Sequence, residues 1–388
     1  MFSSSVVLVT LAIEGLAWIN LDSALMQPLS FYALFALPVL LAVGGVITAL
    51  VPRTLSVNLA VLVGLFALVE IAAWALEPAP PFDSEPQAIG APTFYTPDPV
   101  VGYGLAPSVT ARHWTREGKK VVYDVIYRTD EQGRRLTPTT HDTPSSFLLF
   151  FGDSNTFGQG LAQSETLPYY AGELASGYRP YNYGVPGYGP SQFLVVASQG
   201  RLGKEIPERD GYAVFFLIPA HVGRVVGSSQ VSTRWGRHFA YYTLDVRGGL
   251  VAQGDFAHGR PFTTLAYFVW SKSNLAEYFN VGLPLRYTSA DYRLTARLLA
   301  ESGHQVGRQL HLRGFFVILG PPSNDAERHG NDALRDALVQ EHVNVLDYTR
   351  LFDRREARYR LSDLDRHHSA LANRVMAAQL VSDLGIKR

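Results

Sequence analysis

The chain has 388 residues, equal numbers of basic and acidic side chains, and no cysteine. A formal net charge of +0 and the lack of a Lys/Arg run argue against nucleic acid as a partner, because proteins that bind it carry basic patches. Without cysteine there is no disulfide, thiolate nucleophile, Cys-ligated zinc or iron–sulfur cluster. The chemistry must therefore come from Ser, His, Asp, Glu or a metal site without thiolates.

Residues 1–77 form an apolar head that differs from the rest of the chain. They contain a single basic residue, Arg53, and three apolar stretches at about 6–19, 31–50 and 55–76. The second and third approach the roughly 20 residues that a bilayer core requires. We predict a membrane anchor with two to three transmembrane helices, the first stretch being either a span or an interfacial helix. A cleaved signal is disfavoured because a positively charged n-region is missing.

The charges in this head predict its orientation. Arg53 lies in the tight connection between the second and third stretches, whereas residues 20–27 contain no Lys or Arg. By the positive-inside rule, the Arg53 turn is cytoplasmic and the body lies on the periplasmic or outer side of the inner (cytoplasmic) membrane. Glu14 and Glu70 would then be intramembrane acids, which either contact a partner or are protonated or interface-level carboxylates.

Residues 78–144 are predicted to be a Pro-rich linker followed by a small β region. Seven prolines between 78 and 99 favour an extended spacer. The alternation over 120–127 predicts a strand, and Asp-Glu-Gln-Gly at 130–133 predicts a turn. Three aromatic residues of this region either pack in a core or line a groove: Tyr103, Tyr123 and Tyr127.

The most informative stretch begins with a continuous apolar run at 147–151. Such a run is typical of a buried parallel strand, and Gly152-Asp153-Ser154-Asn155 follows it at once. A serine placed there lies at the carboxyl end of a strand, where open α/β sheets bind their ligands. The alternative is an ordinary strand-to-helix turn with Asp153 or Ser154 as the helix N-cap.

Further polar loops follow predicted strands or precede a helix. Residues 181–189 form a Gly-rich loop, and the strands predicted at 212–218 and 314–319 end in Pro-containing loops. Near the C-terminus, Asp365-Arg366-His367-His368-Ser369 precedes a helical stretch. Strands that alternate with helices indicate an α/β domain with a parallel sheet.

With these residues in view, the body resembles the SGNH, or GDSL-type, hydrolase family of serine esterases and acyltransferases. The likeness covers residues 145–388 and rests on three blocks in order: Gly152-Asp153-Ser154, Asn182-x-Gly184-x-x-Gly187 and Asp365-x-His367. It implies an SGNH-hydrolase-like parallel sheet with flanking helices. The predicted transmembrane helices and small β region would precede that sheet, as in membrane-anchored members.

The resemblance also implies a role for each matched residue. Ser154 would be the nucleophile, His367 the general base and Asp365 the carboxylate that orients it. The backbone N–H groups of Gly187 and Ser154 would form the oxyanion hole. Such a triad makes sense because a serine hydroxyl is a weak nucleophile until a positioned base takes its proton.

The first departure from the family pattern follows the middle strand. Family members carry an asparagine there, but this chain has Pro219-Ala220-His221. We expect His221 to stand in as an oxyanion donor, with Arg224 nearby as a helper or a contact for a substrate carboxylate. The alternative is that His221 is structural and that the third donor is absent.

The second departure is a pair of adjacent histidines. His368 competes with His367 for the role of base, and His367 is favoured by the register of the residues that follow it. Asp363 is a reserve candidate for the carboxylate. Three further residues are expected to contact the substrate or support the site: Asp153, Asn155 and Asn182.

These expectations predict a membrane-anchored serine esterase or O-acyltransferase. Its expected substrate is an acyl ester, above all an acetyl ester, of an envelope carbohydrate or glycolipid. The predicted partners are the lipid bilayer, this substrate and a membrane protein; no nucleic acid and no cofactor is expected. A different class of function is a catalytically weakened SGNH domain that serves as an accessory subunit of a membrane complex.

Two other features are weighed against these functions. The aromatic-rich insert at about 228–287 is expected to line the substrate pocket or to pack as a cap on the domain. His304 and His311 lie seven residues apart on a helical stretch, too far for shared metal ligation. No metal site is therefore predicted.

Overall fold

The computed structural model describes residues 53–76, 82–83, 86–91, 93–139 and 144–386. The chain divides into two compact units. One combines residues 1–79 with 265–282, and the other combines 80–264 with 283–388. The apolar stretches predicted at 6–19 and 31–50, and Glu14 with them, lie outside the described residues.

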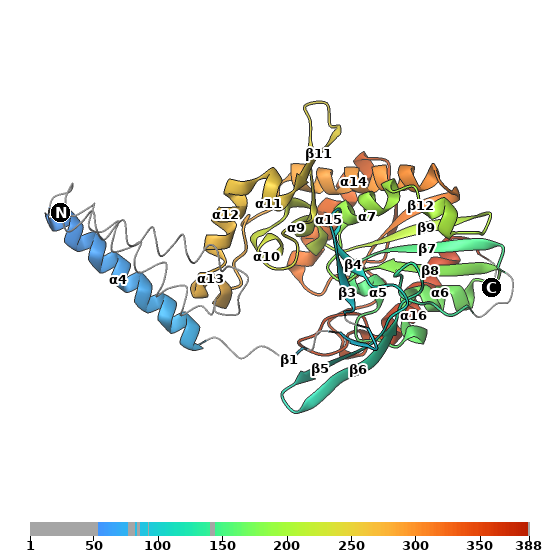
Figure 1. The fold of residues 1–388 in the computed structure, drawn as a ribbon, viewed down its shortest axis with the longest axis horizontal. Coiled ribbons are helices and arrows are strands. Elements are labelled where there is room, and N and C mark those ends of the chain that lie inside the picture. The colour runs from blue at the N-terminus through green and yellow to red at the C-terminus, as the bar shows by residue number, and fades with distance from the viewer. Residues whose placement is uncertain (1–52, 77–81, 84–85, 92, 140–143, 387–388) are drawn as a thin grey trace. The chain divides into compact units, whose positions relative to one another are not determined.

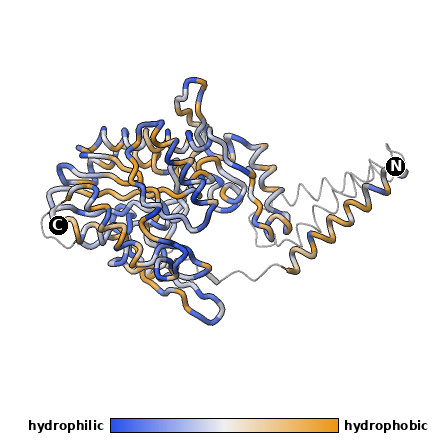
Figure 2. Tube along the Cα trace, turned by 180° about the vertical axis from the view of Figure 1, so that it is seen from behind, coloured by the Kyte–Doolittle hydropathy of each residue, from blue (hydrophilic) through white to orange (hydrophobic). Residues whose placement is uncertain are grey.

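In the first unit, helix α4 (Arg53–Leu76) contacts the short helix α13 (Asn274–Tyr278). Hydrophobic residues run along α4 (Figure 2). Its one acid, Glu70, is 3% exposed, and its carboxylate accepts hydrogen bonds from the Ser273 hydroxyl (2.6 Å) and the Asn274 N–H (2.7 Å). Glu70 thus caps the N-terminus of α13, so the partner of this acid belongs to the same chain.

The transmembrane prediction finds no support in this part of the molecule. Across the described ranges, none of the helices has both the length and the apolar character needed to cross a membrane. The third predicted stretch, 55–76, does form a helix, since it corresponds to α4.

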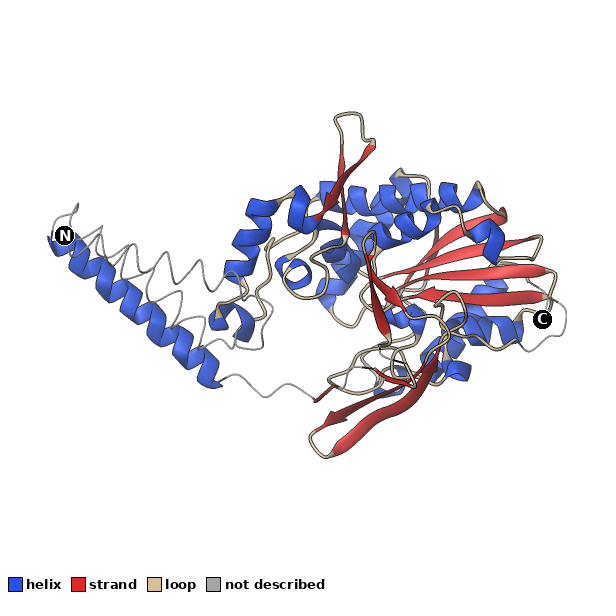
Figure 3. Cartoon of the chain, viewed as in Figure 1, coloured by secondary structure: helices blue, strands red, loops and turns tan. Residues whose placement is uncertain are grey.

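The second unit is built on a five-stranded parallel sheet with the strand order β13-β12-β9-β7-β8 (Figures 1 and 3). The predicted α/β fold with a parallel sheet is confirmed. The apolar run at 147–151 lies in the middle of β7, which is buried along its whole length. The strands are β7 (Ser146–Gly152), β8 (Tyr178–Gly184), β9 (Asp210–Leu217), β12 (His311–Leu319) and β13 (Asn344–Asp347).

Alternate residues of β7 pack on the two faces of the sheet, because successive side chains of a strand point to opposite sides. Phe147, Leu149 and Phe151 join one apolar cluster, whereas Leu148 and Phe150 join the other. Helices α7 (Pro190–Ser198), α14 (Ser289–Gly307) and α15 (Asp325–Gln340) cover the first face. Helices α6 (Leu167–Leu174) and α16 (Ala370–Asp383) cover the second.

Short elements occupy the connections. The helices are α5 (Ser154–Phe157), α8 (Leu202–Glu205), α9 (Ala220–Val226), α10 (Ser229–Ser232), α11 (Phe256–Gly259) and α12 (Pro261–Trp270), with single 3₁₀ turns at Gln163–Glu165 and Ala357–Tyr359. Strands β10 (Ala240–Leu244) and β11 (Leu250–Asp255) form an antiparallel hairpin.

The small β region precedes the sheet. Its strands are β1 (Phe82–Asp83), β2 (Gln87–Ile89), β3 (Tyr95–Asp98), β4 (Gly102–Leu105), β5 (Thr110–Glu117) and β6 (Lys120–Arg128). The strand predicted at 120–127 corresponds to β6. Tyr123 and Tyr127 are buried, and the Tyr127 hydroxyl accepts the Gly160 N–H at 2.8 Å. These tyrosines therefore pack the β region against the residues that follow α5.

Candidate active site

Ser154 lies at the carboxyl end of β7, as the first residue of α5. Asp153 caps this helix by accepting the Asn155 N–H at 2.9 Å. The turn into the helix requires glycine at 152, because φ is +149° and a Cβ there would lie 2.3 Å from Oγ1 of Thr156. This tight turn places the Ser154 hydroxyl at the end of the sheet where polar loops gather.

Ser154, His367 and Asp365 form a continuous hydrogen-bonded chain. Nε2 of His367 lies 2.8 Å from Oγ of Ser154, and Nδ1 lies 2.6 Å from Oδ1 of Asp365. The carboxylate only accepts, so Nδ1 carries the ring proton and Nε2 is left to accept the serine proton. The arrangement is that of a nucleophile, a general base and an orienting carboxylate.

The loop that carries the base is fixed from several sides. The Leu361 N–H donates to the His367 carbonyl at 3.0 Å, and the Asp365 N–H donates to Oγ of Ser362 at 2.8 Å. Nε of the buried Arg354 donates to the Arg366 carbonyl at 3.2 Å. Arg354 and Ser362 were missed from the sequence, because nothing in their spacing indicates that they hold this loop.

Asp363 and His368, the alternatives to Asp365 and His367, do not take part in the hydrogen-bonded chain to Ser154. The Asp363 side chain is 82% exposed and forms an ion pair with Arg360, so Asp365 alone of the two acids reaches the base. His368 is 2% exposed, with its ring packed edge-to-face against Phe216. Burial, followed by the Arg354 cation, lowers the pKa of His368 well below its ordinary value. His368 is therefore a neutral core residue.

Asp153 carries a fully buried negative charge directly before the nucleophile. Burial by itself raises the pKa of a carboxyl, but the Arg224 cation and His221 outweigh that effect and hold the pKa of Asp153 well below its ordinary value. Nη1 of Arg224 donates to Oδ2 of Asp153 at 2.8 Å and to the Tyr188 carbonyl at 2.6 Å. Arg224 thus joins the turn at Ser154 to the Gly-rich loop.

The prediction that His221 donates to the oxyanion needs correction. Its ring is fully buried, and Nδ1 accepts the Ile218 N–H at 3.1 Å. Since burial lowers the pKa of His221, the ring is neutral and its proton lies on Nε2. That atom faces Oδ2 of Asp153 at 3.4 Å. His221 therefore supports the Asp153 carboxylate and does not reach a bound substrate.

Gly187 lies in the loop that follows β8 and has φ of +85°. The Tyr103 hydroxyl donates to the Pro186 carbonyl at 2.5 Å and so holds this loop from the small β region. The backbone N–H groups of Ser154 and Gly187 have no hydrogen-bond partner within the described residues. They remain the candidate donors to an oxyanion.

The two asparagines predicted near the site are both buried and hold its backbone. Nδ2 of Asn182 donates to the Thr156 carbonyl at 3.0 Å, and its Oδ1 accepts the Gly184 N–H at 2.9 Å. Nδ2 of Asn155 donates to Oδ1 of Asp153 at 3.1 Å. Of the two expected roles, the contacts favour support of the site over contact with substrate.

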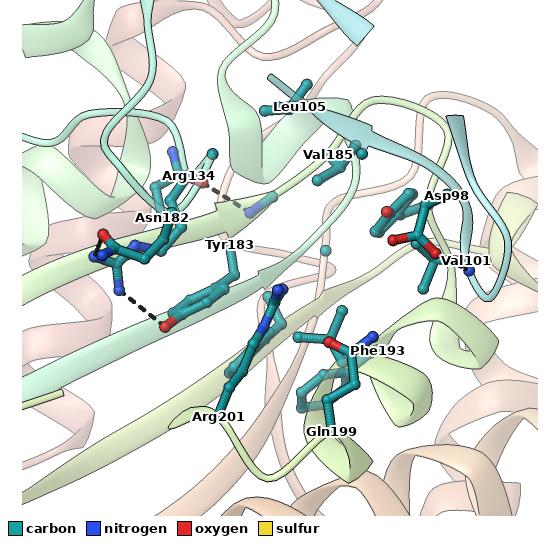
Figure 4. A pocket seen from close by; sticks show the side chains of 18 of the residues that line it. Asp98, Val101, Leu105, Arg134, Asn182, Tyr183, Val185, Phe193, Gln199 and Arg201 are labelled. Atoms are coloured by element: carbon teal, nitrogen blue, oxygen red, sulfur yellow. Dashed lines mark hydrogen bonds between the residues drawn. The ribbon is translucent and has the colours of Figure 1, made fainter. Parts of the chain in front are cut away.

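A cavity of about 140 Å³ lies beside β7 and β8 (Figure 4). Asp98, Arg134, Tyr183 and Arg201 are among its lining residues, and Arg134 donates to the Tyr183 hydroxyl at 2.9 Å. Neither this cavity nor a second one around Arg135 is lined by a residue of the triad or of the insert at 228–287. The expectation that the insert supplies the pocket lining is thus not met at either cavity.

Among the described residues, one group has the side chains to hold a metal ion: the donor atoms of His238, Asp255 and His258 lie within 4.8 Å of one another. His304 does not join it and instead lies 3.7 Å from Glu301 on its own helix. The group was missed from the sequence because its members are brought together by a hairpin.

No family model matches the chain, and no curated protein matches it. Solved structures do align. A member of the lipolytic G-D-S-L family from Veillonella parvula has 10% identity, covers 61% of this chain and 97% of its own, and has a TM-score of 0.37. A carbohydrate acetylesterase from Sinorhizobium meliloti has 12% identity, 62% and 98% coverage and a TM-score of 0.34. A mutant acetylxylan esterase from Geobacillus stearothermophilus has 11% identity, 64% and 98% coverage and a TM-score of 0.35.

Because these identities and TM-scores are low, the chemistry is inferred from the residues of the site itself. The nucleophile, base and carboxylate lie in hydrogen-bonded order at the end of a parallel sheet. The site has the geometry of a serine hydrolase.

Proposed function

We propose that this protein is a serine esterase or O-acyltransferase that uses Ser154, His367 and Asp365. The observation that carries the proposal is the unbroken chain from Oγ of Ser154 through both ring nitrogens of His367 to Oδ1 of Asp365, with contacts of 2.8 and 2.6 Å. A single Ser–His contact could be a structural hydrogen bond. The second contact fixes the imidazole in the tautomer that a general base requires.

The proposed reaction proceeds in two halves. The Ser154 oxygen attacks the acyl carbonyl carbon while its proton passes to Nε2 of His367, and Asp365 stabilises the resulting imidazolium. The N–H groups of Ser154 and Gly187 stabilise the negative oxygen of the tetrahedral intermediate. His367 then returns the proton to the departing alkoxide, which leaves an acyl-serine. In the second half, His367 takes a proton from the acceptor hydroxyl, whose oxygen attacks the acyl carbon. The ester bond to Ser154 then breaks, and His367 returns the proton to Oγ of Ser154.

The acceptor of the acyl group determines whether the reaction is hydrolysis or acyl transfer. Water as acceptor gives an esterase, and a carbohydrate hydroxyl gives an O-acyltransferase. We propose an acetyl ester of an envelope carbohydrate or glycolipid as the substrate, on the strength of the three sequence blocks. The triad itself selects neither the acyl group nor the bond that carries it.

We further propose that residues 1–77 attach the body to the inner membrane, with the active site on its outer side. The support comes from the apolar stretch at 31–50, which is of nearly bilayer length, and from Arg53, which follows it. Large apolar side chains of α4, among them Leu62, Leu65 and Leu68, are also more than half exposed. Carbonate extraction of cell membranes tests this: protein released into the soluble fraction would contradict it.

The experiment for the activity is fluorophosphonate labelling together with p-nitrophenyl acetate turnover on the full-length protein. We expect both in the wild type and neither in Ser154→Ala. Ser191→Ala is the matched control, since Ser191 is also buried and lies on α7. It should keep both signals. Loss of labelling in the control but not in Ser154→Ala would refute the proposed nucleophile.

One observation favours a second function, an accessory subunit of a membrane complex. The residue expected to replace the family asparagine, His221, is fully enclosed with its Nε2 turned toward Asp153 at 3.4 Å, so it does not offer that side-chain donor to a substrate. A folded wild-type protein that neither labels nor turns over ester would favour this function. A co-purifying complex that assembles equally well with Ser154→Ala would strengthen it.

A further inference from the structure

Three side chains meet at the base of the β10–β11 hairpin. Asp255 ends β11, His238 lies two residues before β10, and His258 lies in α11. Nδ1 of His238 is 2.8 Å from Oδ2 of Asp255, and Nδ1 of His258 is 2.8 Å from Oδ1. Each oxygen of one carboxylate thus faces a different imidazole. None of the three residues belongs to the proposed catalytic machinery.

The donor set suits a borderline metal ion such as Zn²⁺. Two imidazoles and one carboxylate occur as the protein ligands of zinc sites that keep an open position. With bonds of about 2.0–2.1 Å, two ligands of tetrahedral zinc stand about 3.3 Å apart. The donor atoms here lie within 4.8 Å of one another, with two contacts at 2.8 Å, so the most distant pair must close by up to about 1.5 Å to hold the ion, which rotation of the exposed histidine side chains can supply.

Local structure accounts for part of this cluster but not for all of it. Asp255 is the N-cap of α11 and accepts the His258 N–H at 2.8 Å, which explains the position of the acid. Capping does not require His238, which precedes the first strand of the hairpin, whereas Asp255 ends the second strand. The two histidine side chains are 58% and 81% exposed, so solvent reaches the cluster and water can complete a coordination sphere.

We propose that His238, Asp255 and His258 bind one Zn²⁺ ion, with water in the remaining position, and that the ion ties together the two ends of the β10–β11 hairpin. This site is independent of the proposed esterase activity. Because the ion binds the folded hairpin, zinc should raise the thermal stability of the protein.

The test is a Zn²⁺ titration of the full-length protein without a polyhistidine tag, in competition with a chromophoric chelator. We expect one ion per chain, and at least about tenfold weaker binding in His238→Ala and in His258→Ala. Asp255→Asn keeps an oxygen to cap α11 but loses the charge, and it should weaken binding as well. His304→Ala is the matched control, since His304 is 68% exposed beside a single carboxylate. It should bind zinc as the wild type does.

A second measurement needs no variant. Zn²⁺ should protect His238 and His258, but not His304, from acylation by diethyl pyrocarbonate, as mapped by mass spectrometry. Zinc binding in His238→Ala and His258→Ala as strong as in the wild type, or protection of other histidines only, would overturn the proposal. So would a wild-type protein that binds no zinc under the competition conditions, whatever its esterase activity.

Discussion

Nε2 of His367 lies 2.8 Å from Oγ of Ser154, although 213 positions separate the two residues. The next residue in the chain, His368, turns the opposite way and packs its ring against Phe216 and Phe352. Arg360 and His368 form an antiparallel β-bridge, so the backbone is extended here and successive side chains point to opposite sides. His367 therefore faces the solvent side and His368 faces the core. One of them is therefore available to the nucleophile and the other is not.

The first prediction separates the two histidines. His367→Ala should lower kcat/KM for p-nitrophenyl acetate by about 10²–10⁴, because it removes the general base. His368→Phe should lower it less than tenfold, since the phenyl ring keeps the aromatic packing. Both variants should be compared at equal folded fraction by circular dichroism. The opposite ranking of the two activities would refute the assignment of the base.

The second prediction concerns the oxyanion donor. Gly187→Ala places a Cβ 2.3 Å from the Tyr103 hydroxyl at φ of +85°, so the loop must move and its N–H with it. Turnover should fall by about 10²–10³, the usual result of losing one such donor. Gly177→Ala is the control: φ there is +83° but a Cβ meets nothing within 4 Å. An equal loss of activity in both variants would point to backbone strain alone.

The sequence was sufficient for the parts of the site that local pattern determines. The apolar run at 147–151 predicted a buried strand, and Ser154 does lie at its carboxyl end. The strand order could not be predicted from the alternation of elements. It puts β7 beside β9, and so places Asp153 within reach of Arg224.

Side-chain direction was the part that the sequence left undetermined. His221 follows β9 at the expected place, but its ring turns inward because the Ile218 N–H and the Asp153 carboxylate both face it. The zinc cluster was missed for a similar reason. The antiparallel register Ala240↔Asp255 brings His238 to an acid 17 positions away, and no spacing in the chain reveals that pairing.

The third prediction concerns the Arg224–Asp153 pair. Arg224→Met should destabilise the fold by about 3–5 kcal/mol, because it leaves a buried carboxylate without its main cation. The double variant Arg224→Met/Asp153→Asn should recover part of that loss, since the unpaired charge is gone. Urea unfolding measures both. If the double variant is less stable than Arg224→Met, the cation does not act through Asp153.

The fourth prediction concerns Glu70. Its carboxylate accepts two backbone N–H groups at the start of α13 as well as the Ser273 hydroxyl. Glu70→Ala should therefore speed hydrogen exchange at the Asn274 and Leu275 amides, which lose their acceptor. Glu70→Gln keeps one acceptor oxygen and should have a smaller effect. Unchanged exchange in Glu70→Ala would show that Glu70 does not cap this helix.

The last prediction concerns the pH dependence of stability. His368 has a pKa far below that of a histidine in the unfolded chain, because burial and the Arg354 cation oppose its charge. Below about pH 6.5 the unfolded chain therefore binds a proton that the folded chain does not, and folding loses up to about 1.4 kcal/mol per pH unit on this account. The sign is fixed: this contribution is absent at high pH and destabilises as the pH falls.

His368→Phe removes that titration, so its unfolding free energy should fall less than that of the wild type between pH 7.5 and pH 5. At pH 7.5 the variant should be about as stable as the wild type, because both ring nitrogens of His368 lack hydrogen-bond partners among the described residues. His329→Gln, at an exposed position of α15, is the control and should follow the wild-type curve. Parallel curves for His368→Phe and the wild type, measured by urea unfolding at each pH, would show that His368 is not the group that titrates.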